Sequence, residues 1–146
     1  MVESPLLNAG IHDFNRSDLE KTFLQAFPSS NTRRSLIHGL NSYIEQLSKF
    51  NIEIEMWLDG SFTTNKLNPN DIDLVMFAAE SDVNRLPPFE QQKLAALLDN
   101  RSVRTKFGCD VYFSPKENSN MRSYWRGWFG FDRDENAKGI ARVMVN

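Results

Sequence analysis

Apolar residues recur at the spacing of an amphipathic helix in four stretches of the chain. Within residues 36–47 they fall at i, i+1, i+4, i+7, i+8 and i+11, which places them on one helix face. Ser17 and Glu20 have the spacing of a capping box, which indicates the start of a helix. Further on, a helix face rich in aromatic residues ends at Gly130. The predicted helices cover residues 18–27, residues 36–47, the stretch from Pro88 through Leu98, and residues 121–129.

An alternation of apolar and polar side chains, or a short apolar run, predicts strands elsewhere. The predicted strands are residues 52–58, 71–78, 102–107, 109–113 and 139–145. Helices interleaved with four or five strands indicate an α/β or α+β fold, in which helices flank a mixed β-sheet.

Composition narrows the class of protein. The chain has 146 residues and 40% of them are hydrophobic, which is enough for one core and indicates a single domain over residues 1–146. Residues 1–16 have little periodicity and are expected to be an irregular N-terminal segment. No run approaches the roughly 18 apolar residues of a membrane span, and a signal-peptide pattern is missing, so we expect a cytoplasmic protein. Cys109 is the only cysteine, which excludes an internal disulfide.

Charge is unevenly distributed along the chain. Residues 1–100 carry 8 basic and 14 acidic side chains, whereas residues 101–146 carry 9 basic and 5 acidic ones. This asymmetry fits either a carboxylate site facing a basic wall across a polyanionic ligand, or ordinary variation of surface charge. The residues considered for such a wall are Arg104, Lys106, Arg122, Arg126, Lys138 and Arg142.

The most distinctive chemistry lies between Gly60 and Asp73. Asp71 and Asp73 are two residues apart at the start of an apolar strand, so their carboxylates project from the same face and repel each other. Hard oxygen ligands of this kind suit Mg²⁺, and a pair of such ions can clamp a triphosphate for in-line attack. The alternative is a hairpin-like turn followed by a strand with solvent-facing aspartates.

A glycine-serine pair supplies the complementary half of this candidate site. Gly60 lets backbone N–H groups approach an anion closely, and the Ser61 hydroxyl is a further donor to a phosphate oxygen. Lys66 is either a phosphate contact or a solvated loop lysine. Lys138 precedes Gly139 at a strand start, where an anion can approach closely, and is a second candidate for nucleotide binding.

Asp110 is the third carboxylate of the candidate site. It opens the apolar run 109–113, and from there it can bind the metal that carries an attacking hydroxyl and accept the proton of that hydroxyl. The alternative is a turn aspartate that caps nearby backbone amides.

These residues together resemble the DNA polymerase β-like nucleotidyltransferase superfamily, in which a Gly-Ser pair precedes an Asp-hydrophobic-Asp motif and a later Asp. The resemblance covers roughly residues 35–115 and implies a minimal nucleotidyltransferase fold. It implies that Gly60 and Ser61 bind the NTP phosphates, and that Asp71, Asp73 and Asp110 hold two Mg²⁺ ions. Asp59 stands where the superfamily usually has an apolar residue before the glycine.

Almost the whole chain is also similar to an uncharacterised bacterial family of minimal stand-alone nucleotidyltransferase-like proteins. The motifs that carry this likeness are GIH at 10–12, RR at 33–34, WLDGSFTTNKLNPNDIDLV at 57–75, FGCDVYF at 107–113 and FGFDRDENAKGI at 129–140. Small members of the superfamily include toxin–antitoxin and phage-defence proteins that modify tRNA or a partner protein. A cognate toxin or antitoxin partner is therefore expected.

The sequence thus leads to two hypotheses of different classes. The first is an Mg²⁺-dependent nucleotidyltransferase that moves a nucleoside monophosphate from an NTP to a hydroxyl of RNA, protein or a small molecule. The second is a catalytically silent nucleotide-binding or antitoxin-like module that keeps the fold. A simple nucleic-acid-binding domain is less favoured, because the net charge is -2 and no nucleic-acid-reading motif is present.

Overall fold

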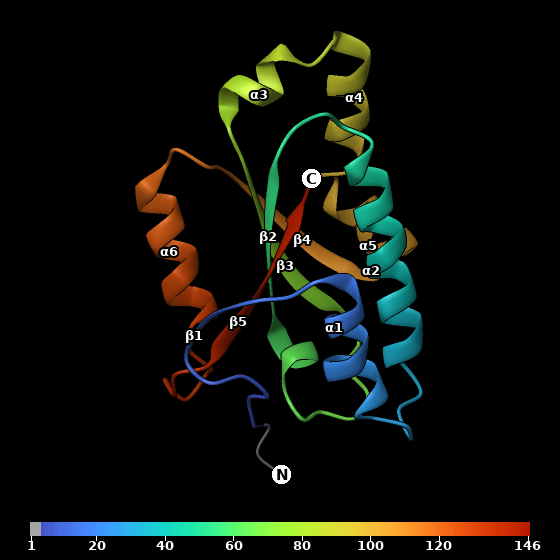
Figure 1. Ribbon diagram of the computed structural model, residues 1–146. Helices are drawn as coiled ribbons and strands as arrows, with labels where there is room; N and C mark the ends of the chain where they lie inside the picture. The colour runs from blue at the N-terminus through green and yellow to red at the C-terminus, as the bar shows by residue number, and fades with distance from the viewer. Residues whose placement is uncertain (1–3) are drawn as a thin grey trace.

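The computed structural model describes residues 4–146, which form a five-stranded mixed sheet with helices on both faces (Figure 1). The strands are β1 (Gly10–Asp13), β2 (Ile54–Asp59), β3 (Ile72–Ala78), β4 (Cys109–Pro115) and β5 (Gly139–Val145). The helices are α1 (Arg16–Glu20), α2 (Arg33–Ser48), α3 (Glu80–Arg85), α4 (Pro88–Ala96), α5 (Asn100–Phe107) and α6 (Ser119–Phe129). The predicted fold class is confirmed.

The strand order is β1-β5-β2-β3-β4. β2 runs antiparallel to both β3 and β5, whereas β1 pairs in parallel with β5 and β4 pairs in parallel with β3. This arrangement brings the end of β2 and the starts of β3, β4 and β5 to the same edge of the sheet. That edge carries the candidate site.

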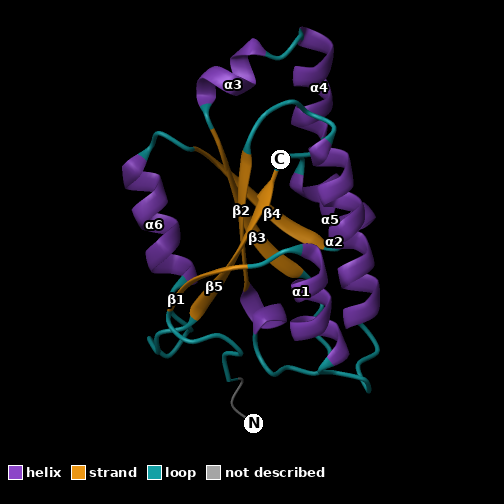
Figure 2. Cartoon of the chain, in the orientation of Figure 1, coloured by secondary structure: helices purple, strands orange, loops and turns teal. Residues whose placement is uncertain are grey.

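Both faces of the sheet are covered (Figure 2). Met56, Leu58 and Leu74 belong to the main core on the side of α2, whereas Trp57 and Val75 pack with α6 on the other side. An alternation of apolar and polar residues is typical of a half-buried strand, but all six residues of β2 are buried, including Glu55 and Asp59. The face of β2 that carries Glu55, Trp57 and Asp59 lies under α6 and not in solvent.

One predicted strand is wrong. Residues 102–107 belong to helix α5, which ends at Gly108 with a φ of 73°. Val103 and Phe107 lie four residues apart, so they share one helix face, and Val103 is buried while Arg101 and Arg104 are exposed. The same residues also fit a two-residue alternation, which explains the error.

The N-terminal segment is less irregular than predicted. Residues 10–13 form β1, which pairs with β5 at the far end of the chain, with Ile11 opposite Ile140. Residues 1–3 of the predicted irregular segment lie outside the described residues. The helix predicted over residues 18–27 consists of α1 followed directly by a wider π-helical turn, η1 (Lys21–Gln25).

None of the helices within residues 4–146 is long and apolar enough to cross a membrane.

Candidate functional site

Three aspartates stand in a row where β2, β3 and β4 meet. Asp59 is opposite Asp73 on the antiparallel neighbour, and Asp73 is opposite Asp110 on the parallel neighbour. Because opposite residues of paired strands project from the same face, all three side chains lie on the α6 face. Asp71 immediately precedes β3. The structure therefore brings Asp71, Asp73 and Asp110 to one place and adds Asp59, the residue just before Gly60.

Burial and mutual repulsion favour the neutral form of the central carboxyl groups. Burial, followed by the charges of Asp71 and Asp110, raises the pKa of Asp73 to about 6, while Lys138 and Arg104 act in the opposite direction. Burial also raises the pKa of Asp59 to about 7, against the opposing effect of Lys138. Perturbed carboxyl groups of this kind are enriched at functional sites, although structural ion pairs also perturb them.

Two cations balance this cluster. Arg104 Nη2 lies 2.7 Å from Asp71 Oδ2, and the Arg104 side chain is 60% exposed. Lys138 Nζ lies 3.0 Å from Asp59 Oδ1, and the Lys138 side chain is only 11% exposed. Lys138 was predicted as a nucleotide contact, and it lies at the edge of this cluster with its charge directed at Asp59.

Asp110 is held by side chains. Asn100 Nδ2 at the start of α5 donates to Asp110 Oδ1 at 2.6 Å, and the Tyr112 hydroxyl donates to Asp110 Oδ2 at 3.2 Å. Asn100 Oδ1 also accepts from the Val111 N–H at 2.9 Å, so one amide side chain bridges α5 and β4. These bonds orient the Asp110 carboxylate and do not correspond to the turn cap considered from the sequence.

Gly60 forms the bend that follows β2. Its φ is 81°, and a Cβ at this position would lie 2.3 Å from Asp73 Oδ2. Only glycine therefore fits here, because the Asp73 carboxylate occupies the space of a side chain. The bend leads into one short 3₁₀ turn, η2 (Gly60–Thr63), in which the Ser61 carbonyl accepts from Thr64 N–H at 3.1 Å.

Arg33 holds the loop that follows this turn, a role that the sequence did not indicate. Arg33 is fully buried, and its guanidinium donates to four main-chain carbonyls. These carbonyls belong to Phe23, Phe62, Thr64 and Lys66, at 2.9, 2.9, 2.8 and 2.7 Å for the closest nitrogen in each case. Burial lowers the pKa of Arg33 to about 10. The main chain of Lys66 is thus fixed by Arg33, and the Lys66 residue is half-buried.

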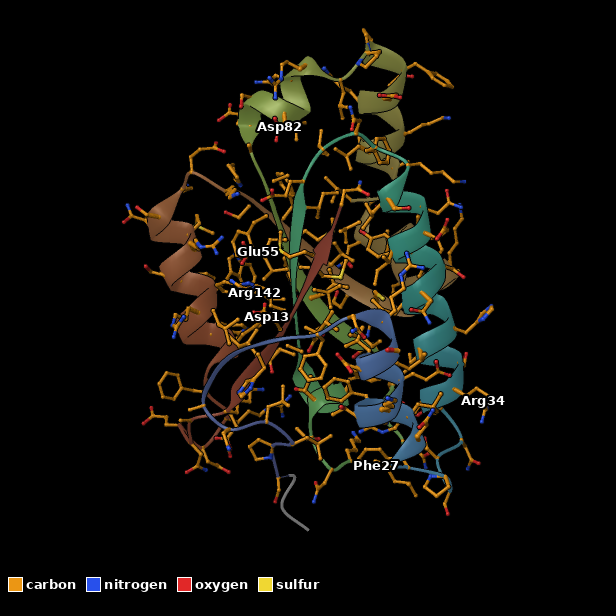
Figure 3. The ribbon with its side chains drawn as sticks, in the orientation of Figure 1. Asp13, Phe27, Arg34, Glu55, Asp82 and Arg142 are labelled. Carbon is orange, nitrogen blue, oxygen red and sulfur yellow. The ribbon has the colours of Figure 1, made fainter. Side chains whose placement is uncertain are left out.

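Arg122 and Arg142 of the predicted basic wall form ion pairs within the protein, away from the aspartate row. Arg122 Nη2 donates to both oxygens of buried Glu55, at 2.7 and 3.0 Å. Arg142 binds Asp13 at 2.6 and 3.1 Å, and Figure 3 shows Glu55, Arg142 and Asp13 close together beside α6. Trp57 is also buried, and its indole N–H donates to a Glu55 carboxylate oxygen at 2.7 Å.

The donor chemistry of the aspartate row suits a hard divalent cation, and the Gly60 bend leaves room for the Asp73 carboxylate. Within residues 4–146, no group of three or more His, Cys, Asp or Glu side chains is gathered closely enough to hold a metal ion. Asp71 instead binds Arg104, and Asp110 binds Asn100 and Tyr112. Asp71 would have to release Arg104 before the carboxylates of Asp71, Asp73 and Asp110 could share a cation.

Fold and site together define an α/β protein whose sheet carries a row of carboxylates at one edge, beside a glycine bend. Residues 1–144 match the model of DUF6932, a family of unknown function. The chain belongs to this family. No curated protein and no solved structure matched it.

Proposed function

We propose that this protein is an Mg²⁺-dependent nucleotidyltransferase that transfers a nucleoside monophosphate from an NTP to a hydroxyl of RNA, protein or a small molecule. The observation that carries the proposal is the register of Asp73 opposite Asp110, with Asp71 one residue before β3 and Gly60 against the Asp73 carboxylate. The same residues carry the sequence resemblance to nucleotidyltransferases.

Two Mg²⁺ ions on Asp71, Asp73 and Asp110 would neutralise the triphosphate and the developing charge of the transfer. The exposed Arg104–Asp71 ion pair is the contact that has to open to let them bind. The Gly60-Ser61 bend would hold the terminal phosphates of the NTP. Lys138, next to Asp59 at the same edge, adds positive charge beside them.

Asp110 fits the role of general base. Its two oxygens are fixed by Asn100 and Tyr112, so the carboxylate is already oriented before an acceptor arrives. The acceptor oxygen would attack the α-phosphorus while its proton passes to Asp110. The bond from the α-phosphorus to its bridging oxygen would break, and pyrophosphate would leave.

The ion pairs that the carboxylates already form favour a second function, that of a catalytically silent module. Arg104 and Lys138 balance Asp71 and Asp59, and the described residues hold no ready cluster of three metal ligands. A catalytically silent nucleotide-binding or antitoxin-like module would keep this arrangement. Under either function, we propose that the protein acts in the cytoplasm, within a toxin–antitoxin or phage-defence system.

The test is transfer of label from each α-labelled NTP to the macromolecules of a cell lysate in the presence of Mg²⁺. The wild-type protein is expected to label one class of macromolecule, and Asp73→Asn is expected to reduce labelling about a thousandfold, because a lost charge-stabilising group typically costs that much. Asp134→Asn, at an exposed loop position, serves as the matched control and should label normally. Equal labelling by wild type and Asp73→Asn would rule out this mechanism, and nucleotide binding without labelling would favour the silent module.

A further inference from the structure

A groove of about 330 Å³ lies between α6 and the strands β1 and β5. Figure 1 shows the end of α6 beside these strands, at the sheet edge where β5 begins. Ile11, Ile140 and Phe131 give the groove apolar walls, and Phe131 is 48% exposed. Such a volume lies at the small end of the range for ligand pockets and suits one nucleoside-sized group.

The charged residues that line the groove are both basic. They are Arg126, in the last turn of α6, and Lys138, just before β5. Among the described residues, no acidic side chain lines the groove. Apolar walls with two cations and no carboxylate complement an aromatic base that carries phosphates.

Lys138 connects the groove to the candidate site. It lines the groove, and its Nζ lies 3.0 Å from Asp59 Oδ1, one residue before the Gly60 bend. Lys138 also acts electrostatically on Asp73. A ligand in the groove that extends past Lys138 would therefore reach the row of aspartates without crossing α6.

We propose that this groove binds the nucleoside part of the NTP, with the triphosphate directed past Lys138 toward Gly60 and Ser61. The inference rests on the proposed function and adds the location of the base and ribose. It also assigns Arg126 and Phe131 to nucleoside binding, a role that neither the carboxylates nor the Gly-Ser pair implies.

Gly127 offers a direct way to block the groove. It lines the groove, and a Cβ added there would meet nothing within 4 Å. A larger side chain at this helical position would therefore begin in open space and would take up room at the groove wall. Gly139 offers no such opportunity, because its Cβ would lie 2.3 Å from the Asn8 carbonyl oxygen.

The experiment compares the binding of ATP, GTP, CTP and UTP with that of inorganic tripolyphosphate, by calorimetry in the presence of Mg²⁺. The wild-type protein is expected to bind at least one NTP about tenfold or more tighter than tripolyphosphate, because only the NTP fills the groove. Gly127→Leu should lower the affinity for that NTP to the level of tripolyphosphate and leave tripolyphosphate binding unchanged. Gly127→Ala is the matched control and should retain most of the preference.

A second variant tests the groove without a substitution in helix α6. Phe131→Ala removes an exposed aromatic ring from the groove wall and should weaken NTP binding several-fold with tripolyphosphate binding unchanged. Equal affinity of the wild type for every NTP and tripolyphosphate, or unchanged NTP affinity in folded Gly127→Leu and Phe131→Ala, would overturn the inference while leaving the phosphate site intact. Failure of the wild type to bind either kind of ligand would instead overturn the proposed function together with the inference.

Discussion

The two ion pairs at the acidic edge of the sheet differ in their exposure to solvent. In the pair of Arg104 with Asp71 the side chains are 60% and 23% exposed, whereas in the pair of Lys138 with Asp59 they are 11% and 2% exposed. An exposed pair contributes little to stability and opens readily. A buried pair cannot lose one partner without leaving an uncompensated charge. The outer pair can therefore give way to a cation, while the inner pair belongs to the framework of the site.

Removal of the inner cation is expected to have the largest effect on stability. Lys138→Met should lower the free energy of unfolding by about 3 kcal/mol at pH 8, because it leaves the Asp59 carboxylate buried without its partner. The loss should be smaller at pH 5, since the pKa of Asp59 is about 7 and the carboxyl group already holds its proton there. Urea denaturation of both proteins at the two pH values measures this difference. An equal loss at pH 5 and pH 8 would mean that the Asp59 charge is not involved.

The inner carboxyl group should also shape the dependence of stability on pH. The pKa of Asp59 is raised from 3.8 to about 7 in the folded protein, so between these values the unfolded chain releases a proton that the folded protein keeps. The free energy of unfolding should therefore fall as pH rises from about 4 to about 7. Asp59→Asn should flatten this decline, leaving the part that Asp73 causes, which ends near its pKa of about 6.

Denaturant titrations from pH 4 to pH 8 without divalent ions give this profile. Asp134→Asn again serves as the control and should keep the slope of the wild-type protein. A profile of Asp59→Asn that overlays the wild-type profile would show that Asp59 ionises normally in the folded state.

The outer pair should produce the smallest effect on stability and a gain in cation binding. Arg104→Met should change the free energy of unfolding by less than about 1 kcal/mol, because the Arg104 side chain is largely exposed. It should also raise the affinity for Mg²⁺ by a few-fold, since Asp71 no longer has to exchange a cation. Weaker Mg²⁺ binding by Arg104→Met would show that the outer pair does not compete with the metal.

The same contrast explains what could be predicted from the sequence. The two-residue alternation of β2 and β3 is a local pattern, and it predicted strands where β2 and β3 lie. The ion pair of Asp59 with Lys138 joins two residues that are far apart in the sequence, so no local pattern contains it. Lys138 was proposed from its neighbouring glycine, but its partner became apparent only from the sheet order.

Other features depend on contacts that form only in the folded chain. β1 is four residues long and is defined by its pairing with β5, more than a hundred residues away. The role of Arg33 arises because carbonyl groups from η1 and the loop after η2 converge on one guanidinium. α5 was missed because its apolar residues, Val103 and Phe107, fit a two-residue alternation as well as one face of a helix.

The most direct test of the aspartate row is the binding of Mn²⁺, as a paramagnetic substitute for Mg²⁺, measured by electron paramagnetic resonance in the presence of an NTP. The wild-type protein should bind Mn²⁺, and Asp134→Asn should bind it equally well. Asp73→Asn should lose this binding, because Asp73 lies between Asp59 and Asp110 in the sheet register. Undiminished Mn²⁺ binding by folded Asp73→Asn would contradict the assignment of a cation and nucleotide site to this edge of the sheet.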